Sequence, residues 1–392
     1  MKTDWKIKKL GEICDFEGGS QPPKSNFIHE PRKGYVRFLQ IRDFGSDKYI
    51  TYIPDSKKNR HCNEDDILLG RYGASVGKIL VNKKGAYNVA VMKTMPNTEM
   101  VDKSYFYYYL ISDEFQKPLS KVAARSAQAG FSKDDIYNFS VLTPPVLEQK
   151  KIVKKLDDIF EYVTKAKENA EQNLQNSKEL FESYLQNVFS NPGKDWEEKK
   201  IKEIGVTQTG LTPKTANKKY YGNFVPFITP ADVDILGDGS VRYDSKGLSE
   251  EGLEVGRRIK KDSVLMVCIG ATIGKVGFST RVISCNQQIN TLTPFDGYDA
   301  KLFYYILSTK SFFNKVIKAS SQATLPIINK GKWENLSVSF PKSISEQKAI
   351  VKKLETLSLE TKKLEAIYEK KLLDLEELKK SVLRRAFNGK LK

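Results

Sequence analysis

The sequence predicts an α+β protein in which two duplicated mixed α/β lobes are separated by two long antiparallel coiled-coil helices in a pseudo-two-fold arrangement. The first observation is a stretch at residues 148–189 that recurs at 346–387, with an offset of 198 residues and no insertion or deletion. The second is that the segments before the two stretches also begin alike, at Trp5 and at Trp196. The third is a four-and-three spacing of apolar residues in both stretches, which is typical of a coiled-coil seam.

Each repeated stretch predicts one long helix. Both copies begin with Glu-Gln-Lys and share the run Ile-Val-Lys-Lys-Leu, which starts at Ile152 in the first copy and at Ile350 in the second. At ~1.5 Å per residue, about 42 residues make a helix of ~60 Å, which is longer than a globular domain is wide. An apolar stripe on so long a helix needs a partner, and the other copy supplies one if the two helices are antiparallel. The alternative is two core helices of ordinary domains, which a seam uninterrupted by Gly or Pro disfavours.

The predicted seam residues are apolar positions that recur along both helices. They are Ile152, Leu156, Ile159, Val163, Leu174 and Phe181 in the first helix, and Ile350, Leu354, Leu357, Leu364, Leu372 and Leu375 in the second. The step from Ala170 to Leu174 repeats a spacing of four, a stutter that locally unwinds a supercoil. The chain is thereby divided into lobes at 1–146 and 191–344 and helices at 147–190 and 345–392.

The two lobes predict the same series of elements. In each, a turn that begins at Gly19 or Gly210 precedes a strand that leads into Phe38–Asp43 or Phe227–Asp232. The segments that follow, 44–63 and 233–257, share little in length or sequence, yet both lead to further apolar strands. A final strand, at 138–144 or 335–341, enters each long helix. A common scaffold that carries different loops is therefore expected.

A Gly-x-x-x-Gly-Lys sequence recurs in the lobes, starting at Gly73 and at Gly270. A phosphate-binding loop has four residues between its glycines and a Ser or Thr after its lysine, whereas Ile79 and Val276 follow the lysines here. We interpret the sequence as a strand turn whose glycines allow close backbone approach.

Aromatic and amide residues leave two interpretations open. The runs Tyr105–Tyr109 and Phe303–Tyr305 resemble base-stacking platforms, but apolar residues continue them, which favours packed helices. Asn88 and the run 286–290 carry amide side chains that fit bidentate pairing with adenine and are equally typical of polar strand ends.

The formal charge of +17 lies mainly on the lobes, with +6 on residues 1–146 and +7 on residues 191–344, whereas residues 147–190 carry −1 and residues 345–392 carry +5. Two basic lobes fit a polyanion that is held at two places. A Lys-rich proteome would account for the same charge.

No stretch of the sequence predicts catalysis, metal binding or membrane insertion. The histidines, His29 and His61, have no match in the second lobe, and the cysteines show no CxxC spacing, so we expect them to be reduced and structural. No apolar run is long enough to span a bilayer, and the N-terminus lacks the apolar core of a signal peptide. We expect a cytoplasmic protein without a catalytic or metal site.

The order of lobe, Glu-Gln-Lys helix, lobe and second such helix, together with the ending Leu383–Leu391, resembles the specificity (S) subunit of type I restriction-modification systems. The resemblance covers the whole chain, and the two long helices are its specific part. It implies that the lobes are target-recognition domains, each of which reads one half of a bipartite, asymmetric site in double-stranded DNA. The helices would set the spacer between the half-sites.

The resemblance also implies partners. Two methyltransferase (M) subunits would dock on the helices, and restriction/translocase (R) subunits would join them. S-adenosylmethionine, ATP and Mg²⁺ would belong to those partners, so that the chain itself would hold no cofactor and would be no enzyme.

If the lobes read DNA, polar residues on their turns and strand ends are the candidate contacts. In the first lobe they are Arg42, Arg71, Tyr72, Ser75, Lys78, Arg125 and Gln128, and in the second they are Thr229, Thr272, Lys275, Gln287, Ser321 and Gln322. Arg favours guanine and Gln favours adenine, while Lys is equally suited to phosphate.

Two other classes of function remain open. One is a coiled-coil assembly scaffold with basic, protein-binding lobes, which would bind a duplex weakly and without sequence preference. The other is an enzyme with an unrecognised site.

Overall fold

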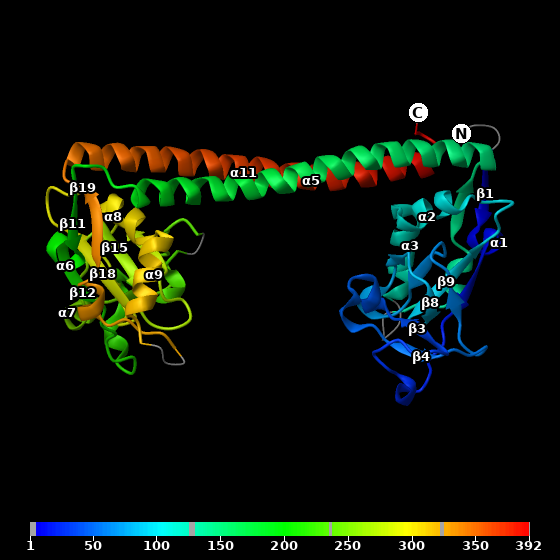
Figure 1. The fold of residues 1–392 in the computed structure, drawn as a ribbon, viewed down its shortest axis with the longest axis horizontal. Helices are drawn as coiled ribbons and strands as arrows, with labels where there is room; N and C mark the ends of the chain where they lie inside the picture. Colours follow the sequence, from blue (N-terminus) through cyan, green and yellow to red (C-terminus); the bar gives the residue numbers. More distant parts are fainter. Residues whose placement is uncertain (1–4, 125–129, 235–236, 322–324, 392) are drawn as a thin grey trace. The chain divides into compact units, whose positions relative to one another are not determined.

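The computed structural model describes residues 5–124, 130–234, 237–321 and 325–391, and these form two compact units (Figure 1). One unit is Met1–Glu171 with Glu369–Lys392, and the other is Gln172–Tyr368. Each unit combines one lobe with one end of each long helix, α5 (Val146–Ser190) and α11 (Ile344–Phe387). The boundary between the units therefore falls within the helices and not at their ends.

The first lobe alternates short strands with short helices along the chain. Its elements are β1 (Lys6–Lys9), α1 (Leu10–Ile13), β2 (Cys14–Gly18), η1 (Lys24–Asn26), β3 (Tyr35–Leu39), η2 (Ile41–Phe44), η3 (Asp47–Tyr49), β4 (Tyr52–Pro54), β5 (His61–Cys62), β6 (Leu68–Gly70), η4 (Gly73–Ser75), β7 (Ile79–Leu80), β8 (Gly85–Tyr87), β9 (Val91–Pro96), α2 (Lys103–Ile111), α3 (Asp113–Ala123), α4 (Lys133–Tyr137) and β10 (Ser140–Thr143).

The second lobe repeats most of this order. Its elements are β11 (Trp196–Lys200), α6 (Ile201–Ile204), β12 (Gly205–Thr209), η5 (Lys218–Tyr220), β13 (Tyr221–Ile228), η6 (Pro230–Asp232), β14 (Gly247–Leu248), α7 (Glu250–Val255), β15 (Ser263–Val267), β16 (Val276–Ser279), β17 (Ser284–Cys285), β18 (Ile289–Pro294), α8 (Ala300–Leu307), α9 (Lys310–Ala319), α10 (Lys330–Trp333) and β19 (Ser337–Pro341).

The sheets of the two lobes correspond in all of their strands but one. An antiparallel sheet has the order β2-β9-β6-β7 in the first lobe and β12-β18-β15-β16 in the second. A smaller sheet contains one parallel pair in each lobe, β3 with β8 and β13 with β17. The expected duplicated α+β fold is thus confirmed, and the lobes differ where β5 has no matching strand among the described residues of the second lobe.

The aromatic runs pack in the cores of the lobes. Tyr105, Tyr109 and Phe303 are buried, which confirms the packed helices expected there. All of the cysteines are free and buried, and burial raises the pKa of the Cys62 thiol to about 11. No helix of the described residues is long and apolar enough to cross a membrane.

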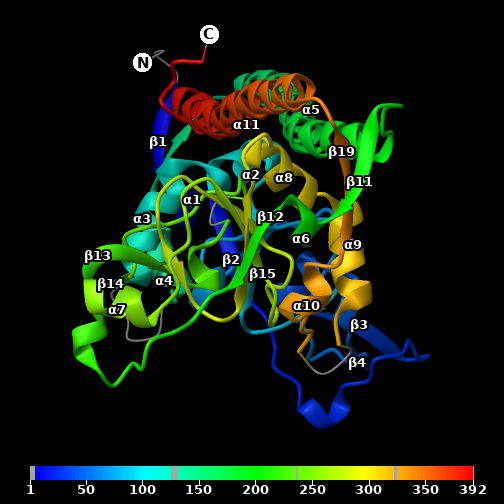
Figure 2. The same cartoon turned by 90° about the vertical axis from the view of Figure 1, so that its left-hand side faces the viewer.

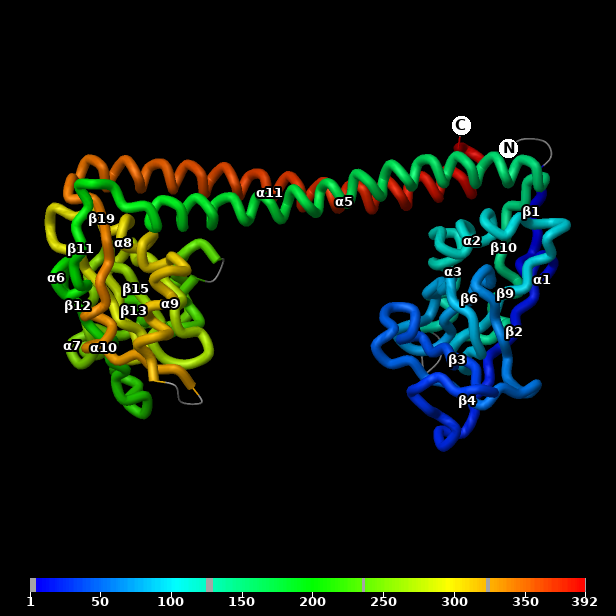
Figure 3. The backbone as a smooth tube through the Cα atoms, in the orientation of Figure 1, coloured from blue at the N-terminus to red at the C-terminus, as the bar shows by residue number. Residues whose placement is uncertain are grey.

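A two-stranded ribbon leads from each lobe into its long helix. β1 pairs with β10, and β10 continues into α5; β11 pairs with β19, and β19 continues into α11 (Figures 2 and 3). The strands expected to enter the helices are therefore present. The glutamine of each Glu-Gln-Lys sequence lies in the first turns of the helix that follows.

That glutamine ties the helix to its lobe by the same contacts in both units. Gln149 is fully buried; its Oε1 accepts from the Asp102 amide at 2.7 Å, and its Nε2 donates to Pro144 O at 2.8 Å. Gln347 is also fully buried, and it accepts from the Asp299 amide at 2.9 Å and donates to Pro341 O at 2.8 Å. Asp102 and Asp299 in turn cap α2 and α8. The repeated Gln is thus a joint between two helices and a strand.

In the first unit the beginning of α5 lies against the end of α11. Leu156 shares a core with Leu383 and Phe387, and the Phe387 ring lies 5.0 Å from that of Tyr105. Further along, Lys167 Nζ pairs with Glu376 Oε1 at 2.8 Å. The helices are therefore antiparallel within this unit.

In the second unit the end of α5 lies against the beginning of α11. Leu185 shares a core with Val351 and Leu354, and the Phe181 ring lies 6.3 Å from that of Tyr305. The helices are antiparallel here as well.

The twelve predicted seam residues differ in burial. Ile152, Leu156, Val163 and Leu354 are buried, Ile159, Leu174, Phe181, Ile350, Leu357, Leu372 and Leu375 are partly buried, and Leu364 is 37 % exposed. Thr361, three residues earlier in α11, is buried, and its hydroxyl donates to Leu357 O in the same helix at 3.0 Å. At this point of the stripe a small polar residue is buried and the predicted leucine is exposed.

We predict that Gln149→Ala opens the joint in the first unit. The substitution removes the partner that Gln149 gives to the partly buried Asp102 amide and to the Pro144 and Met100 carbonyls, at about 1–3 kcal/mol for each buried group. Hydrogen–deuterium exchange should show the Asp102 amide exchanging at least about tenfold faster. Gln347→Ala is the matched control and should accelerate Asp299 alone. Unchanged exchange at Asp102 would contradict the assignment.

Candidate nucleic-acid interface

In the first lobe polar side chains meet where the parallel strands β3 and β8 end. Leu39 lies beside Tyr87, and the Asn88 amide donates to Leu39 O at 3.0 Å. The Asn88 side chain donates to Gln21 Oε1 at 3.2 Å. Gln40 directly follows β3. We call Gln21, Gln40 and Asn88 the strand-end cluster of the first lobe.

The second lobe repeats this arrangement with other side chains. Ile228 lies beside Cys285, and the Asn286 amide donates to Ile228 O at 3.0 Å. Thr212 Oγ1 donates to Gln287 Oε1 at 2.5 Å. Thr229 follows β13 as Gln40 follows β3. The strand-end cluster of the second lobe is Thr212, Thr229, Asn286 and Gln287.

Glycine brings the preceding turn against these strand ends. A Cβ atom built on Gly19 would lie 2.1 Å from Asn88 O, and one built on Gly210 would lie 2.1 Å from Asn286 O. Both distances are far inside van der Waals contact, so only glycine permits the approach. The backbone of the cluster is thus fixed in both lobes, while its side chains differ.

A buried carboxylate accepts hydrogen bonds from one residue of each cluster. Asp43 and Asp232 are both 1 % exposed. Asp43 Oδ2 accepts from the Gln40 amide at 2.7 Å, whereas Asp232 Oδ2 accepts from the Thr229 amide at 3.0 Å and from the Thr229 hydroxyl at 2.7 Å. The other carboxylate oxygen, Oδ1, differs between the lobes. Asp43 Oδ1 has no partner among the described residues, whereas Asp232 Oδ1 accepts from Arg242 Nη2 at 2.8 Å.

Because Asp232 has more hydrogen-bond donors around it than Asp43, the pKa values of the two carboxyls shift in opposite directions. Burial raises the pKa of Asp43 above its usual value. Burial also acts on Asp232, but hydrogen bonds from Thr229, Ser245 and Arg242 hold its pKa below the usual value. The matched positions therefore differ in charge environment as well as in neighbours.

The turn formed by the Gly-x-x-x-Gly-Lys sequence, at 73–78 and 270–275, contacts a second turn in each lobe. Tyr72 bridges to Gly130 in the first lobe, while in the second lobe Ile269 bridges to Ile327 and the Gly270 amide donates to Pro326 O at 3.1 Å. Gly77 and Gly274 have positive φ, which glycine allows in a tight strand turn.

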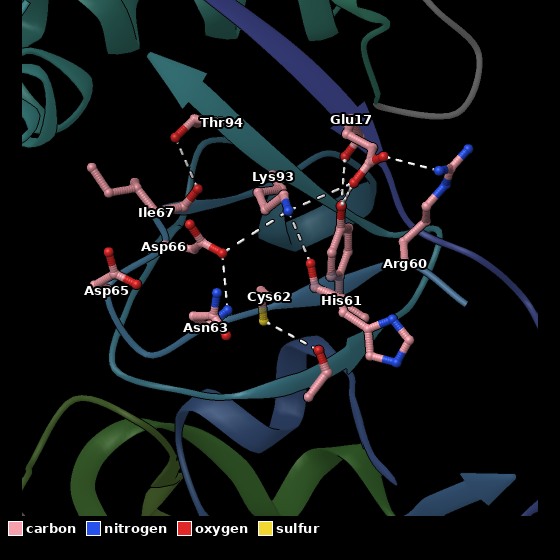
Figure 4. Close-up of polar contacts among 12 residues, drawn as sticks. Glu17, Arg60, His61, Cys62, Asn63, Asp65, Asp66, Ile67, Lys93 and Thr94 are labelled. Carbon is pink, nitrogen blue, oxygen red and sulfur yellow. Dashed lines mark hydrogen bonds and ion pairs between the residues drawn. The ribbon is translucent and has the colours of Figure 1, made fainter. Parts of the chain in front are cut away.

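The face of β2 and β9 in the first lobe is charged. Glu17 Oε1 pairs with Arg60 at 3.0 Å, its Oε2 accepts from the Tyr87 hydroxyl at 2.9 Å, and Lys93 Nζ lies 3.8 Å from the same Oε2 (Figure 4). Glu17 and Lys93 face each other across the sheet, and the matching pair in the second lobe is Gln208 with Thr291. The charged pair of the first lobe is thus replaced by two uncharged polar residues at the matching positions of the second lobe.

The sequence matches the family model of the type I restriction modification DNA specificity domain twice, over residues 2–176 and 193–373. The chain belongs to this family. It is similar to the MjaVIII type I specificity subunit of Methanocaldococcus jannaschii, with 24 % identity over 100 % of this chain and 94 % of the relative. It is also similar to the EcoBI specificity subunit of Escherichia coli, with 24 % identity over 100 % of this chain and 87 % of the relative.

Solved structures share the fold of this specificity subunit. The HsdS subunit of Thermoanaerobacter tengcongensis matches with a TM-score of 0.65 and 19 % identity, over 100 % of this chain and 98 % of that chain. A chain from a structure of type I R-M complex assembly and conformational transition matches with a TM-score of 0.79 and 19 % identity, over 100 % of this chain and 99 % of that one.

Of the candidate contacts in the first lobe of this specificity subunit, Arg42, Tyr72 and Lys78 are exposed. The Arg42 guanidinium donates to Thr51 Oγ1 at 3.3 Å, and that of Arg71 donates to Phe131 O at 3.2 Å and stacks on Tyr72. Ser75 is 9 % exposed, and its hydroxyl donates to Tyr72 O within the turn.

In the second lobe Thr229 and Gln287 come together in the strand-end cluster, and Thr272 and Ser321 are exposed on the adjoining turns. Lys275 lies on the same turn as Thr272, whose carbonyl accepts from the Lys275 amide at 3.2 Å. It lines a hollow of about 580 Å³ with Asp234 of the lobe and with Phe181 and Thr361 of the long helices. Arg125, Gln128 and Gln322 lie outside the described residues.

Sequence reasoning missed Gln21, Thr212, Asp43, Asp232 and Arg242. The signal for the two carboxylates is present, because each lies five residues after the Phe of a repeated strand. Arg242 gives no such signal, since it comes from a segment that shares little in length or sequence with its counterpart in the first lobe.

We predict that Asn substitution of the two carboxylates has unequal effects. Asp43→Asn replaces a buried charge by a neutral amide, whose oxygen can keep the bond from the Gln40 amide and whose NH2 group takes the unpartnered position. It should leave stability at pH 7 unchanged within about 1 kcal/mol or raise it, whereas Asp232→Asn weakens a charged pair and should destabilise the second lobe by about 1–3 kcal/mol. Urea unfolding followed by hydrogen exchange, which reports each lobe separately, measures both.

The pH dependence supplies the control. The raised pKa of Asp43 favours folding most at pH below the usual pKa, and this contribution is lost as the pH rises through the raised value. The lowered pKa of Asp232 favours folding at pH above the usual pKa, and this contribution is lost as the pH falls through the lowered value. Acidification should therefore favour the wild-type first lobe over its Asp43→Asn variant and should erase the deficit of Asp232→Asn. Equal losses at pH 7 in the two variants would contradict the contrast.

Proposed function

We propose that the chain reads DNA for a type I restriction-modification complex, with each lobe recognising one half of a bipartite, asymmetric site. The observation that carries this proposal is the pair of strand-end clusters, which have the same backbone hydrogen bonds but different side chains. Two domains that read different half-sites must agree where they fold and differ where they meet bases. Asn88 and Asn286 are shared, but Thr212 takes the place of Gln21 and Thr229 takes the place of Gln40, so different donors and acceptors stand in matched places.

The charge distribution supports DNA as the ligand. The two lobes carry +6 and +7, and contacts from Lys and Arg to phosphate would supply affinity that does not depend on sequence. Specificity would then rest on the few side chains that reach base edges.

We further propose that two methyltransferase (M) subunits dock on α5 and α11 and that restriction/translocase (R) subunits join them. S-adenosylmethionine, ATP and Mg²⁺ would be bound by these partners, and this chain would contribute recognition without catalysis. The long helices offer the exposed apolar residues Tyr162, Leu180 and Leu359 for such contacts.

Exchange of one lobe tests independent reading. Replacing residues 14–139 by the matching part of a relative with another specificity keeps the β1–β10 ribbon and should change one half-site, because the second lobe is untouched. Mapping methylated bases in a host that carries the complex reports both half-sites. The reciprocal exchange of residues 205–336 should change only the other half.

Two results of this exchange would contradict the proposal. Simultaneous change of both half-sites would refute independent reading. Binding that stays weak and independent of sequence in the complete complex would favour the coiled-coil scaffold with protein-binding lobes.

We propose that the two helices set the spacer. Adding four residues to each helix, after Glu171 and after Tyr368 where the units meet, lengthens each by ~6 Å and turns it by ~400°, so both seams keep nearly their register. Since DNA advances ~3.4 Å per base pair, the spacer should grow by one to two base pairs with both half-sites unchanged. Methylation mapping measures spacer and half-sites together.

A two-residue addition at the same points is the matched control. It turns each helix by ~200°, which moves the seam residues beyond it to the wrong face and should abolish methylation. A four-residue variant that is fully active with the original spacer would refute the role of the helices.

A further inference from the structure

Arg242 is held in one orientation by a buried carboxylate. Its Nε and Nη2 atoms both donate to Asp232 Oδ1, at 3.0 and 2.8 Å, and its backbone amide donates to Asp232 O at 2.9 Å. The Asp232 side chain is 2 % exposed, whereas that of Arg242 is 45 % exposed. A long side chain on the surface has thus lost much of its rotational freedom before any ligand arrives.

The pairing leaves one edge of the guanidinium open. Asp232 occupies the edge formed by Nε and Nη2. Nη2 also makes one long contact, 3.5 Å, with Ala231 O, and no residue that the structure describes accepts a hydrogen bond from Nη1. Nη1 and the second proton of Nη2 form the end-on edge of the fork, which matches two neighbouring acceptors in a plane. In the major groove, O6 and N7 of guanine are such a pair.

Arg242 is joined to the strand-end cluster through the same carboxylate. Asp232 Oδ2 accepts from both the amide and the hydroxyl of Thr229, so Thr229 and Arg242 bind opposite oxygens of one side chain. Thr229 follows Ile228, whose carbonyl accepts from the Asn286 amide. The oriented guanidinium therefore lies next to the side chains that we assign to DNA.

The first lobe has no matching pair of a buried carboxylate and an arginine among its described residues. The matching carboxylate, Asp43, leaves Oδ1 unpartnered among the described residues, and Arg42 donates to Thr51 and lies 5.8 Å from the Tyr49 ring. An arginine oriented by the carboxylate of the strand-end turn is thus a property of the second lobe.

We infer that Arg242 reads a guanine in the half-site of the second lobe, and that Asp232 and Thr229 are positioning residues that hold its guanidinium for this contact. The inference rests on the proposed function, since it assumes that the lobe reads DNA. It explains why a buried carboxylate holds an exposed arginine at the edge of the cluster.

The test uses the complex assembled with its methyltransferase subunits, after methylation mapping has established the wild-type site. Methylation rates are then measured on duplexes in which each guanine of one half-site is replaced in turn. Arg242→Gln should lower the preference for one guanine, in the half assigned to the second lobe, by about tenfold or more, and leave the other half unchanged. Arg242→Lys keeps the charge but not the fork, so it should lose the same preference.

Asp232→Asn and Arg281→Gln separate orientation from charge. Asp232→Asn keeps Arg242 but weakens its support, so discrimination at the same guanine should fall more than overall binding does. Arg281 lies in the same lobe, exposed and stacked on Tyr243 at 4.9 Å, and Arg281→Gln removes one positive charge without touching Asp232. It should preserve base discrimination, whether or not overall affinity falls.

Failure of the inference and failure of the proposed function give different results. A wild-type complex that methylates no bipartite site would refute the proposed function. A wild-type complex with a defined site, whose Arg242→Gln or Arg242→Lys form keeps full discrimination at every guanine, would overturn the role of Arg242 alone. Equal loss of discrimination in Arg281→Gln would also overturn it, because charge and not orientation would then be responsible.

Discussion

A buried glutamine at the start of each long helix fixes the path of the chain. Gln149 and Gln347 each accept from the amide of an aspartate that caps a lobe helix and donate to the proline carbonyl that ends the preceding strand. Because both ends of the amide are satisfied away from water, the side chain cannot turn without leaving polar groups unpaired. Each long helix therefore leaves its lobe in a fixed direction, and the repeated Glu-Gln-Lys sequence is explained by geometry.

A rigid frame allows the lobes to differ at their strand ends. Gly19 and Gly210 hold the turn against the strand by backbone contacts alone, so the side chains beside them are free to vary without loss of the fold. The same freedom extends to the sheet, where Glu17 with Lys93 in one lobe corresponds to Gln208 with Thr291 in the other. Differences in chemistry are concentrated where the frame does not need particular side chains.

The sequence predicts the long helices and the strands that enter them better than it predicts the strand-end clusters. The duplicated offset and the seam spacing predict both long helices, and the strand that enters each of them, because repetition and period survive without tertiary information. Gln287 and Thr229 were identified as candidates, but their neighbours come from distant segments. Thr212 meets Gln287 across 75 residues, and Arg242 meets Asp232 through a loop that differs in length and sequence from its counterpart, so no repeated pattern reveals either pair. Thr361 is buried and Leu364 is exposed for a similar reason: spacing indicates which residues share a stripe, and only packing decides which of them are buried.

The order of the chain has a consequence for how the first unit forms. Its core contains Leu156 from α5 but also Leu383 and Phe387 from the last turns of α11, and Phe387 packs on Tyr105 and Tyr109. These contacts join residues separated by more than half of the sequence, and such pairings carry a loop-closure cost that must be met before they stabilise the fold. The second unit lies within one continuous segment, Gln172–Tyr368. The first lobe therefore exposes part of its aromatic core until the end of the chain is available, whereas the second lobe can complete its core without the residues that flank it.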